Sequence, residues 1–107
     1  MLTLDYSFSV IEVRTTETFD RWFGRLRDRQ ARIRIQVRID RLSWGNPGQY
    51  RALSGGLHEM KIDHGPGYRI YYAYSGGAVV VLLCGGDKRT QRRDIGLAAE
   101  MRRLLEE

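Results

Sequence analysis

The fold of this chain is decided by residues 57–94, which read LHEMKIDHGPGYRIYYAYSGGAVVVLLCGGDKRTQRRD. Within them lie three runs rich in apolar and aromatic residues: 57–62, 68–74 and 78–84. The connections between the runs are short and contain glycine, as hairpin turns between antiparallel strands do. The run 78–84 is apolar on both faces, which is typical of a central strand. The stretch therefore predicts an antiparallel sheet.

Upstream of this stretch, the hydrophobic pattern predicts a strand followed by a helix. Residues 8–13 are mostly apolar and read as a strand. Thr15 or Thr16 then provides a helix N-cap. Apolar side chains follow at the spacing of one helical face, which predicts a stripe that faces the core: Phe19, Trp22, Phe23 and Leu26.

The segment 31–44, ARIRIQVRIDRLSW, fits two secondary structures. Its β-branched residues alternate with polar ones, which favours a strand: Ile33, Ile35, Val37 and Ile39. A helix would instead gather Ala31, Ile35, Ile39 and Leu42 on one face. It would leave a second apolar face for a partner, formed by Ile33, Val37 and Trp44. The region is also rich in arginine, which indicates either a solvated face or a docking surface for an acidic partner.

The remaining segments predict one more strand and a final helix. Residues 50–53, YRAL, follow the glycine and proline of 45–48 and read as a short strand. Thr90 is placed to cap a last helix. The apolar stripe of that helix consists of Leu97, Ala98, Met101, Leu104 and Leu105. We expect this helix either to cover the sheet or to dock on a partner.

Alternation along the strands of 57–94 predicts which side chains share a face. Glu59 and Lys61 point one way from the first strand, and Arg69 and Tyr71 point the same way from the second. We expect burial on the opposite face, so these four residues belong to an open face. Two cations beside an aromatic ring form a platform for a phosphate and a stacked base. The alternative is a surface Lys and Arg that pair with Glu59.

A second pair of cations, Lys88 and Arg89, follows the central strand and the turn Gly85-Gly86. Backbone amides at a glycine turn that leads into a helix favour the binding of an anion. The turn is not a nucleotide-binding P-loop, which needs a longer glycine frame that ends in Gly-Lys-Ser/Thr.

Composition and length limit the chemistry further. A chain of 107 residues is expected to form one domain, 1–107. The net charge of +5, carried mostly by arginine, favours an acidic partner such as RNA, DNA or an acidic protein. Cys84, His58 and His64 show no metal-site spacing, so we expect neither a metal nor a cofactor. No membrane span or signal pattern is recognisable, so we expect a cytoplasmic protein.

Two motifs are similar to those of a known family. GPGYRIYY, at 65–72, is followed about one strand later by GGDK-x-x-Q-x-x-D, at 85–94. Together with residues 22–48, WFGRLRDRQARIRIQVRIDRLSWGNPG, they resemble the RelE/ParE superfamily of bacterial toxins, and within it the HigB-like addiction module killer branch. The resemblance implies an α+β fold with an N-terminal strand, a helical hairpin, a curved antiparallel sheet and a C-terminal helix. It also implies that 31–44 is helical.

The resemblance further implies a function, that of a toxin of a type II toxin-antitoxin system. The family's best-known activity is ribosome-dependent cleavage of messenger RNA, in which a 2′-hydroxyl attacks the adjacent phosphate without a metal. By that analogy, the catalytic residues are Lys61, Arg69, Lys88 and Arg89, and the RNA-binding residues are Tyr71, Gln91 and Arg92. The implied partners are the ribosome, messenger RNA and a cognate helix-turn-helix antitoxin that forms a complex with the toxin.

Two positions depart from the family's better-known members. Glu59 stands where those members carry a second lysine, and Ile95 stands where they carry a tyrosine. The candidates to fill these gaps are Tyr71, Asp87, Gln91 and Asp94. The alternative function is that of a ParE-like toxin, which binds and inhibits DNA gyrase without catalysis. Because the cations are retained, the resemblance favours the endoribonuclease.

Overall fold

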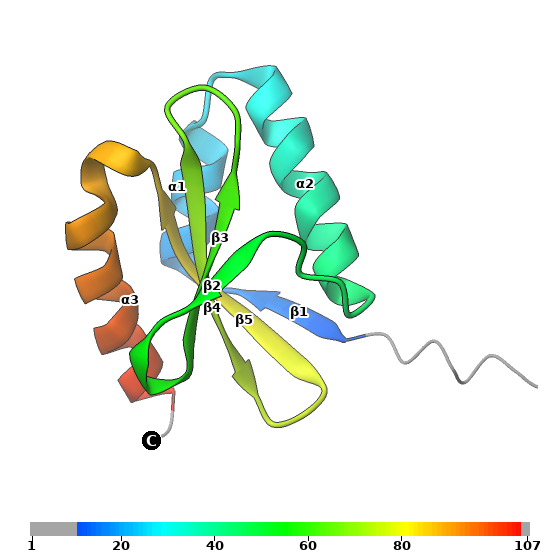
Figure 1. Cartoon of the computed structure of the whole chain (residues 1–107), viewed down its shortest axis with the longest axis vertical. Helices are drawn as coiled ribbons and strands as arrows, with labels where there is room; N and C mark the ends of the chain where they lie inside the picture. Colours follow the sequence, from blue (N-terminus) through cyan, green and yellow to red (C-terminus); the bar gives the residue numbers. More distant parts are fainter. Residues whose placement is uncertain (1–10, 106–107) are drawn as a thin grey trace, which may run out of the picture.

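The computed structural model describes residues 11–105 and shows an α+β fold (Figure 1). Its elements are β1 (Glu12–Thr15), α1 (Glu17–Arg25), α2 (Arg29–Ser43), β2 (Tyr50–Ala52), β3 (Leu57–Ile62), β4 (Tyr68–Ser75), β5 (Val79–Gly86) and α3 (Gln91–Leu104), with the 3-10 turns η2 (Ser54–Gly56) and η3 (Lys88–Thr90). This order confirms the predicted strand, helical hairpin, sheet and C-terminal helix. Of the strand predicted at 8–13, residues 8–10 lie outside the described residues.

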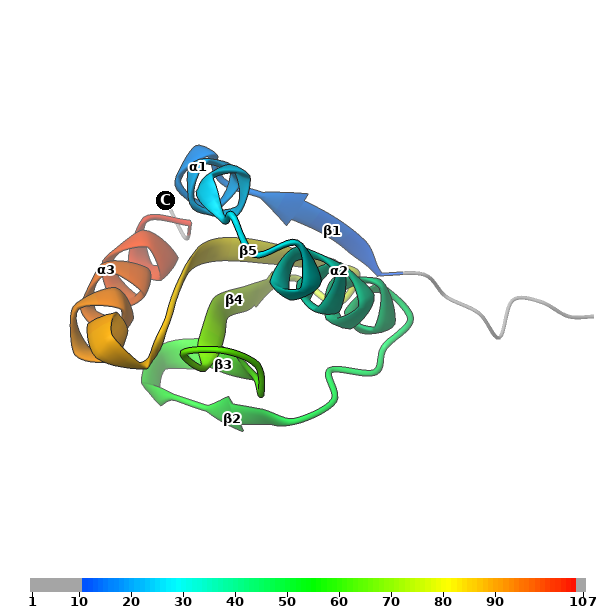
Figure 2. The ribbon, with the colours of Figure 1, turned by 90° about the horizontal axis from the view of Figure 1, so that it is seen from above.

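The five strands form one curved sheet in the order β1-β5-β4-β3-β2 (Figure 2). Strands β2 to β5 pair antiparallel, as the glycine-bearing turns predict. The pairing of β1 with β5 is parallel, so the sheet is mixed and the antiparallel prediction is wrong for this one pair. The reason is the path of the chain, because it leaves β1 through two helices and three further strands before it meets β5.

Helix α1 begins at the second of the two candidate caps. The Thr16 hydroxyl oxygen accepts a hydrogen bond of 3.0 Å from the Phe19 N–H and donates one of 2.6 Å to the Leu83 carbonyl. Thr16 therefore satisfies a free amide of the helix and ties its start to β5. Phe19 is buried, and the rest of the predicted stripe packs around it, which confirms that α1 faces the core.

The ambiguous segment 31–44 is almost entirely helix α2, as the resemblance implies. Asp28 caps it by accepting a hydrogen bond of 3.2 Å from the Ala31 N–H. Ala31, Ile35 and Leu42 have no exposed surface, whereas Ile33 and Val37 are largely exposed. The helix forms despite the β-branched alternation because it buries one apolar stripe against the sheet. The free energy gained by this burial exceeds the weak preference of β-branched residues for strands.

Both faces of the sheet are covered, which corrects the expectation of an open face. One core contains Met60, Ile70 and Tyr72 under α1 and α2. A second core contains Leu57, Tyr71 and Ala73, and Ala98 of α3 packs into it. Figure 2 shows α2 and α3 on opposite sides of the centre of the sheet. Glu59, Arg69 and Tyr71 are therefore buried.

Helix α3 covers the sheet, but its apolar stripe is narrower than the sequence predicts. Ala98 is buried and Met101 is partly buried, whereas Leu97, Leu104 and Leu105 are exposed. Thr90 occupies the N-cap position without a capping hydrogen bond from its side chain to α3. Within residues 11–105, no helix is long and apolar enough to cross a bilayer.

Candidate functional site: a cation pocket at the sheet edge

A pocket of about 260 Å³ lies where β2, β3 and β4 meet the start of α3. Three cations, one carboxylate and three uncharged residues line it: Gln49, Tyr50, Arg51, Glu59, Lys61, Arg69 and Gln91. Because the cations outnumber the carboxylate by three to one, the formal charge of the lining is +2. We call this site the cation pocket.

The strand register brings the charged residues together. Lys61 of β3 lies directly opposite Arg69 of β4, and Glu59 of β3 lies directly opposite Arg51 of β2. Residues two apart on β3 point to the same side, so all four side chains share one face. The sequence predicted the placement of Lys61 and Arg69 from this alternation. The hairpin between β2 and β3 adds Arg51.

Glu59 is the centre of the hydrogen-bond network in the cation pocket. Its Oε1 accepts a hydrogen bond of 3.1 Å from Arg51 Nε and lies 3.0 Å from Arg51 Nη2. Its Oε2 accepts hydrogen bonds of 3.0 Å from the Tyr71 hydroxyl and 2.8 Å from Gln91 Nε2. Both carboxylate oxygens are thus engaged, and Glu59 links β2, β4 and α3 to β3.

Arg69 is a buried cation with unused hydrogen-bonding capacity. Its Nη1 donates a hydrogen bond of 2.7 Å to the Gly67 carbonyl. Its Nε lies 3.7 Å from Glu59 Oε2 and has no hydrogen-bond partner among the described residues. Gly67 has a φ of +80° and leaves room for the guanidinium, since a Cβ there would lie 3.2 Å from Nη1. Arg69 is therefore held by the Gly67 carbonyl and the Glu59 carboxylate, with its side chain in the lining of the cation pocket.

Tyr71 does not form the predicted stacking platform, because its ring has no exposed surface. Burial, followed by the Glu59 carboxylate, raises the pKa of its hydroxyl well above the ordinary value. The hydroxyl stays protonated and donates to Glu59. A ring enclosed by the sheet and α3 cannot stack on a base, so the prediction for Tyr71 is wrong about its exposure.

Lys61 lies at the rim of the cation pocket, with about two-fifths of its side chain exposed. Its Nζ lies 3.5 Å from Asp63 Oδ1, a separation typical of a loose surface ion pair. Lys61 is therefore the cation of the pocket that can most easily follow an incoming ligand.

The second predicted pair of cations lies outside this lining. Arg89 is exposed and forms an ion pair of 3.2 Å with Asp87. This partner and the resulting hydrogen bond raise the pKa of Arg89. Lys88 begins η3 and does not line the cation pocket either. The structure thus places Lys61 and Arg69 in one pocket lining, whereas Lys88, whose Cβ lies near the same side of Gly67 as the Arg69 guanidinium, is outside that lining.

The space beside the turn at Gly85-Gly86, where the sequence predicted an anion, is filled by a side chain of the protein itself. A Cβ on Gly86 would lie 1.8 Å from Asp94 Oδ2. This carboxylate is buried and accepts a hydrogen bond from the Thr90 hydroxyl. The backbone N–H of Arg89 at this turn donates to Asp87 Oδ1, and that of Asp87 donates to Thr90 Oγ1, so side chains of the protein use these amides.

Gln91 and Arg92 extend the site along the start of α3. A second hollow of about 340 Å³ is lined by Arg51, Gln91, Arg92 and Ile95, and it shares Arg51 and Gln91 with the cation pocket. Ile95 packs against the second core, so the position of the family's tyrosine is taken here by a core contact. The two hollows form one basic surface at the edge of the sheet.

Arg51 is the charged residue of the cation pocket that the sequence analysis missed. Residues 50–53 were predicted to form a strand, and the turn at 54–56 connects it to the strand that carries Glu59. Counting outward from this turn would have placed Arg51 opposite Glu59. The register of the hairpin, and not the residue type, was therefore the feature of the sequence that could have predicted Arg51 as a site residue.

The described part of the chain contains no group of three or more His, Cys, Asp or Glu residues placed to hold a metal ion. His64 is used elsewhere, because its Nε2 lies 2.9 Å from Asp28 Oδ2 at the start of α2. Cys84 is buried, and desolvation followed by the charge of Asp94 raises its pKa to about 12. Its thiol is therefore a core group and not a nucleophile.

The α+β fold is compatible with that of RelE/ParE-like toxins. Residues 21–103 match the family described as "Phage derived protein Gp49-like (DUF891)". The chain belongs to this Gp49-like family, which is a RelE/ParE-like toxin family. It is also similar to a protein of Haemophilus influenzae described as "Uncharacterized protein", with 46% identity over 85 residues that cover 79% of this chain and 86% of that protein.

Proposed function

We propose that this protein is the toxin of a type II toxin-antitoxin system and cleaves messenger RNA on the ribosome, as HigB-like members of the superfamily do. It acts in the cytoplasm and is held inactive in a complex with a helix-turn-helix antitoxin. Membership in the Gp49-like family supports the toxin role. The observation that carries the nuclease role is the cation pocket, in which Lys61 and Arg69 lie opposite each other beside Arg51.

The proposed reaction is an internal transesterification of RNA. The 2′-oxygen attacks the adjacent phosphorus and gives up its proton, the bond to the 5′-oxygen breaks, and that oxygen takes up a proton. The products are a 2′,3′-cyclic phosphate and a 5′-hydroxyl. Negative charge accumulates on the phosphate oxygens in the transition state, and fixed cations stabilise that charge. In this proposal Arg69 and Lys61 bind these oxygens and Arg51 extends the positive surface, which is supported by their common position in the lining of the cation pocket.

Glu59 acts in this proposal as a positioning residue. Its two oxygens already accept hydrogen bonds from Arg51, Tyr71 and Gln91. The carboxylate thereby fixes Arg51 at the pocket by a hydrogen bond and pairs more loosely with Arg69, 3.7 Å away. The replacement of a family lysine by Glu59 therefore changes how the site is held together and leaves a net positive pocket.

The test is cleavage by purified toxin of a messenger RNA bound to purified ribosomes, with the 5′ ends mapped by primer extension. Lys61→Ala removes a rim cation without opening the core, and we expect at least a 100-fold loss of cleavage. Arg69→Lys keeps the charge but loses the planar fork, and we expect a loss of about 10-fold or more. The control is Arg14→Ala, which removes an exposed cation from β1 at the opposite edge of the sheet.

Two outcomes would contradict the nuclease. One is the absence of new 5′ ends together with inhibition of gyrase supercoiling by the same preparation, which would establish the ParE-like alternative. The other is full cleavage by Lys61→Ala, which would move the chemistry away from the cation pocket. The retention of full activity by Arg14→Ala would show that the losses are specific to the pocket.

A further inference from the structure

Helix α2 has a second apolar surface that the fold leaves uncovered. Two large apolar residues of α2 and the residue that follows its end are strongly exposed: Ile33 at 50%, Val37 at 42% and Trp44 at 74%. Their spacing of four and seven residues places them on one face of the helix. The helical interpretation of this segment predicted such a face. We call this surface, together with Arg34 and Arg41, the α2 face.

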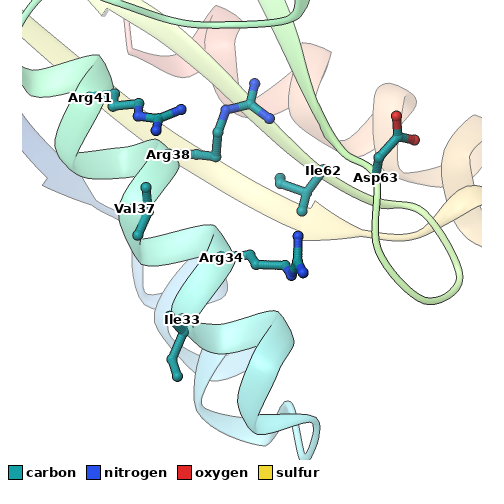
Figure 3. A pocket seen from close by; sticks show the side chains of 7 residues that line it. All are labelled: Ile33, Arg34, Val37, Arg38, Arg41, Ile62 and Asp63. Carbon is teal, nitrogen blue, oxygen red and sulfur yellow. The ribbon is translucent and has the colours of Figure 1, made fainter.

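A hollow lies between the α2 face and the end of β3. It has a volume of about 340 Å³ and is lined by Ile33, Arg34, Val37, Arg38, Arg41, Ile62 and Asp63. Figure 3 shows the arginines reaching from α2 toward Ile62 and Asp63, with Ile33 and Val37 along the helix beside them. The surface thus combines an apolar ridge with a cationic border.

The cations on this border differ in their existing contacts. Arg38 is used by the fold, since its guanidinium donates hydrogen bonds to the carbonyls of Lys61, Pro47 and Gln49. Arg34 and Arg41 are exposed, and within residues 11–105 neither forms an ion pair. Two guanidiniums that flank apolar side chains are suited to carboxylates carried by an apolar ligand.

We propose that the α2 face binds an acidic amphipathic helix of a partner protein. This inference rests on the proposed function, because it gives the chemistry of the segment with which the antitoxin would contact the toxin. Residues four apart on α2 form a ridge that packs against the equivalent ridge of another helix. From Ile33 to Trp44 the face is about 16 Å long, which about three turns of helix cover.

Two other occupants fit the surface less well. A second copy of this chain would bring Arg34 and Arg41 of both copies together in a symmetric contact, and like charges oppose each other. RNA would satisfy the arginines but leave Ile33 and Val37 without an apolar partner. An acidic amphipathic helix satisfies both groups.

The test is a selection of displayed helical peptides of about 16 residues, with randomised surface positions, on the purified full chain. We expect acidic sequences with apolar residues four apart to be enriched. Their binding, measured by fluorescence anisotropy, should weaken at least 10-fold in Ile33→Ser/Val37→Ser and in Arg34→Ser/Arg41→Ser. It should not change in Leu97→Ser/Leu104→Ser, a matched control that removes two similarly exposed apolar residues from α3.

The emission of Trp44 provides an independent readout. Bound peptide should shift tryptophan emission to shorter wavelength, and Trp44→Phe should abolish the shift. Failure to enrich acidic helices would overturn the proposal. So would dimerisation that depends on Ile33 and Val37, or binding of a ribosomal RNA hairpin that depends on the arginines alone. None of these readouts requires RNA cleavage, so failure of the nuclease proposal and failure of this one are distinguishable.

Discussion

The substitution Glu59→Gln tests most directly how the cation pocket is held together. It keeps the shape of the side chain but removes its charge and one of its two acceptor oxygens. Arg51, Tyr71 and Gln91 all donate to the carboxylate, so at least one of these donors would face the new amide group. Leaving a buried donor unsatisfied costs about 1–3 kcal/mol.

The buried cation adds a second cost. Arg69 is 7% exposed, and Glu59 is the carboxylate with which it pairs, at 3.7 Å. Removal of one partner of a buried pair costs roughly 3–5 kcal/mol when the pair is close, and less at this distance. Taking both effects together, we expect Glu59→Gln to lower the free energy of unfolding by about 3 kcal/mol, a large part of the roughly 5–15 kcal/mol of a typical domain.

Substitution of the other partner of this ion pair, Arg69→Met, should lower the free energy of unfolding by about half as much as Glu59→Gln. Glu59 would retain its hydrogen bonds from three other side chains, and the methionine would fill the buried volume. The structure thus predicts an asymmetry between the two partners. If the only effect were the loss of the Glu59–Arg69 ion pair, the two substitutions would lower stability equally.

The assay is urea denaturation followed by circular dichroism at neutral pH. The control is Glu12→Gln, which removes the charge of an exposed ion pair with Arg14 and should leave the midpoint of urea denaturation unchanged. A Glu59→Gln protein within 0.5 kcal/mol of wild type would refute the reasoning. So would a larger cost for Arg69→Met than for Glu59→Gln.

Three further predictions concern the rest of the fold. Ile35→Ala should lower stability by about 2–5 kcal/mol and Ile33→Ala by less than about 0.5 kcal/mol, measured by urea denaturation, because only Ile35 is fully buried. Equal costs would contradict the orientation of α2. The thiol of Cys84 should react with a thiol reagent at pH 8 only as the protein unfolds, since burial raises its pKa to about 12; rapid labelling of folded protein would show that it is accessible. A hydrogen bond from the Ala31 N–H, followed by the contact with His64, holds the pKa of Asp28 below its ordinary value of 3.8. Its charge therefore stabilises the fold above about pH 4, and the advantage of wild type over Asp28→Asn should be lost as the pH falls through the lowered pKa; an advantage that persists at pH 2 would contradict this assignment.

The sequence determined the strands and the positions of two site residues. Alternating apolar residues between glycine turns fix where strands begin and end, because a hairpin needs both a pleated face and a turn that glycine allows. The same alternation placed Lys61 opposite Arg69, as the register shows. These properties are local, and local patterns are what a single sequence records.

Three features depended on packing between distant segments. Residues 31–44 carry a strand pattern, and only burial of Ile35 against the sheet makes them a helix. Tyr71 and Glu59 lie on a face that alternation left open, and α3 closes it. The parallel contact of β1 with β5 joins segments more than 60 residues apart.

The cation pocket itself combines both kinds of information. The sequence shows which cations the protein has, but not which of them line the pocket. Arg51 lines it, whereas Lys88 and Arg89 do not. Arg51 joins because the pairing of β2 with β3 places it opposite Glu59. Sequence alone therefore determined the strands that follow residue 50 and the basic character of the protein. Tertiary structure decided which charges meet, because charge interactions depend on distances that only the packed chain defines.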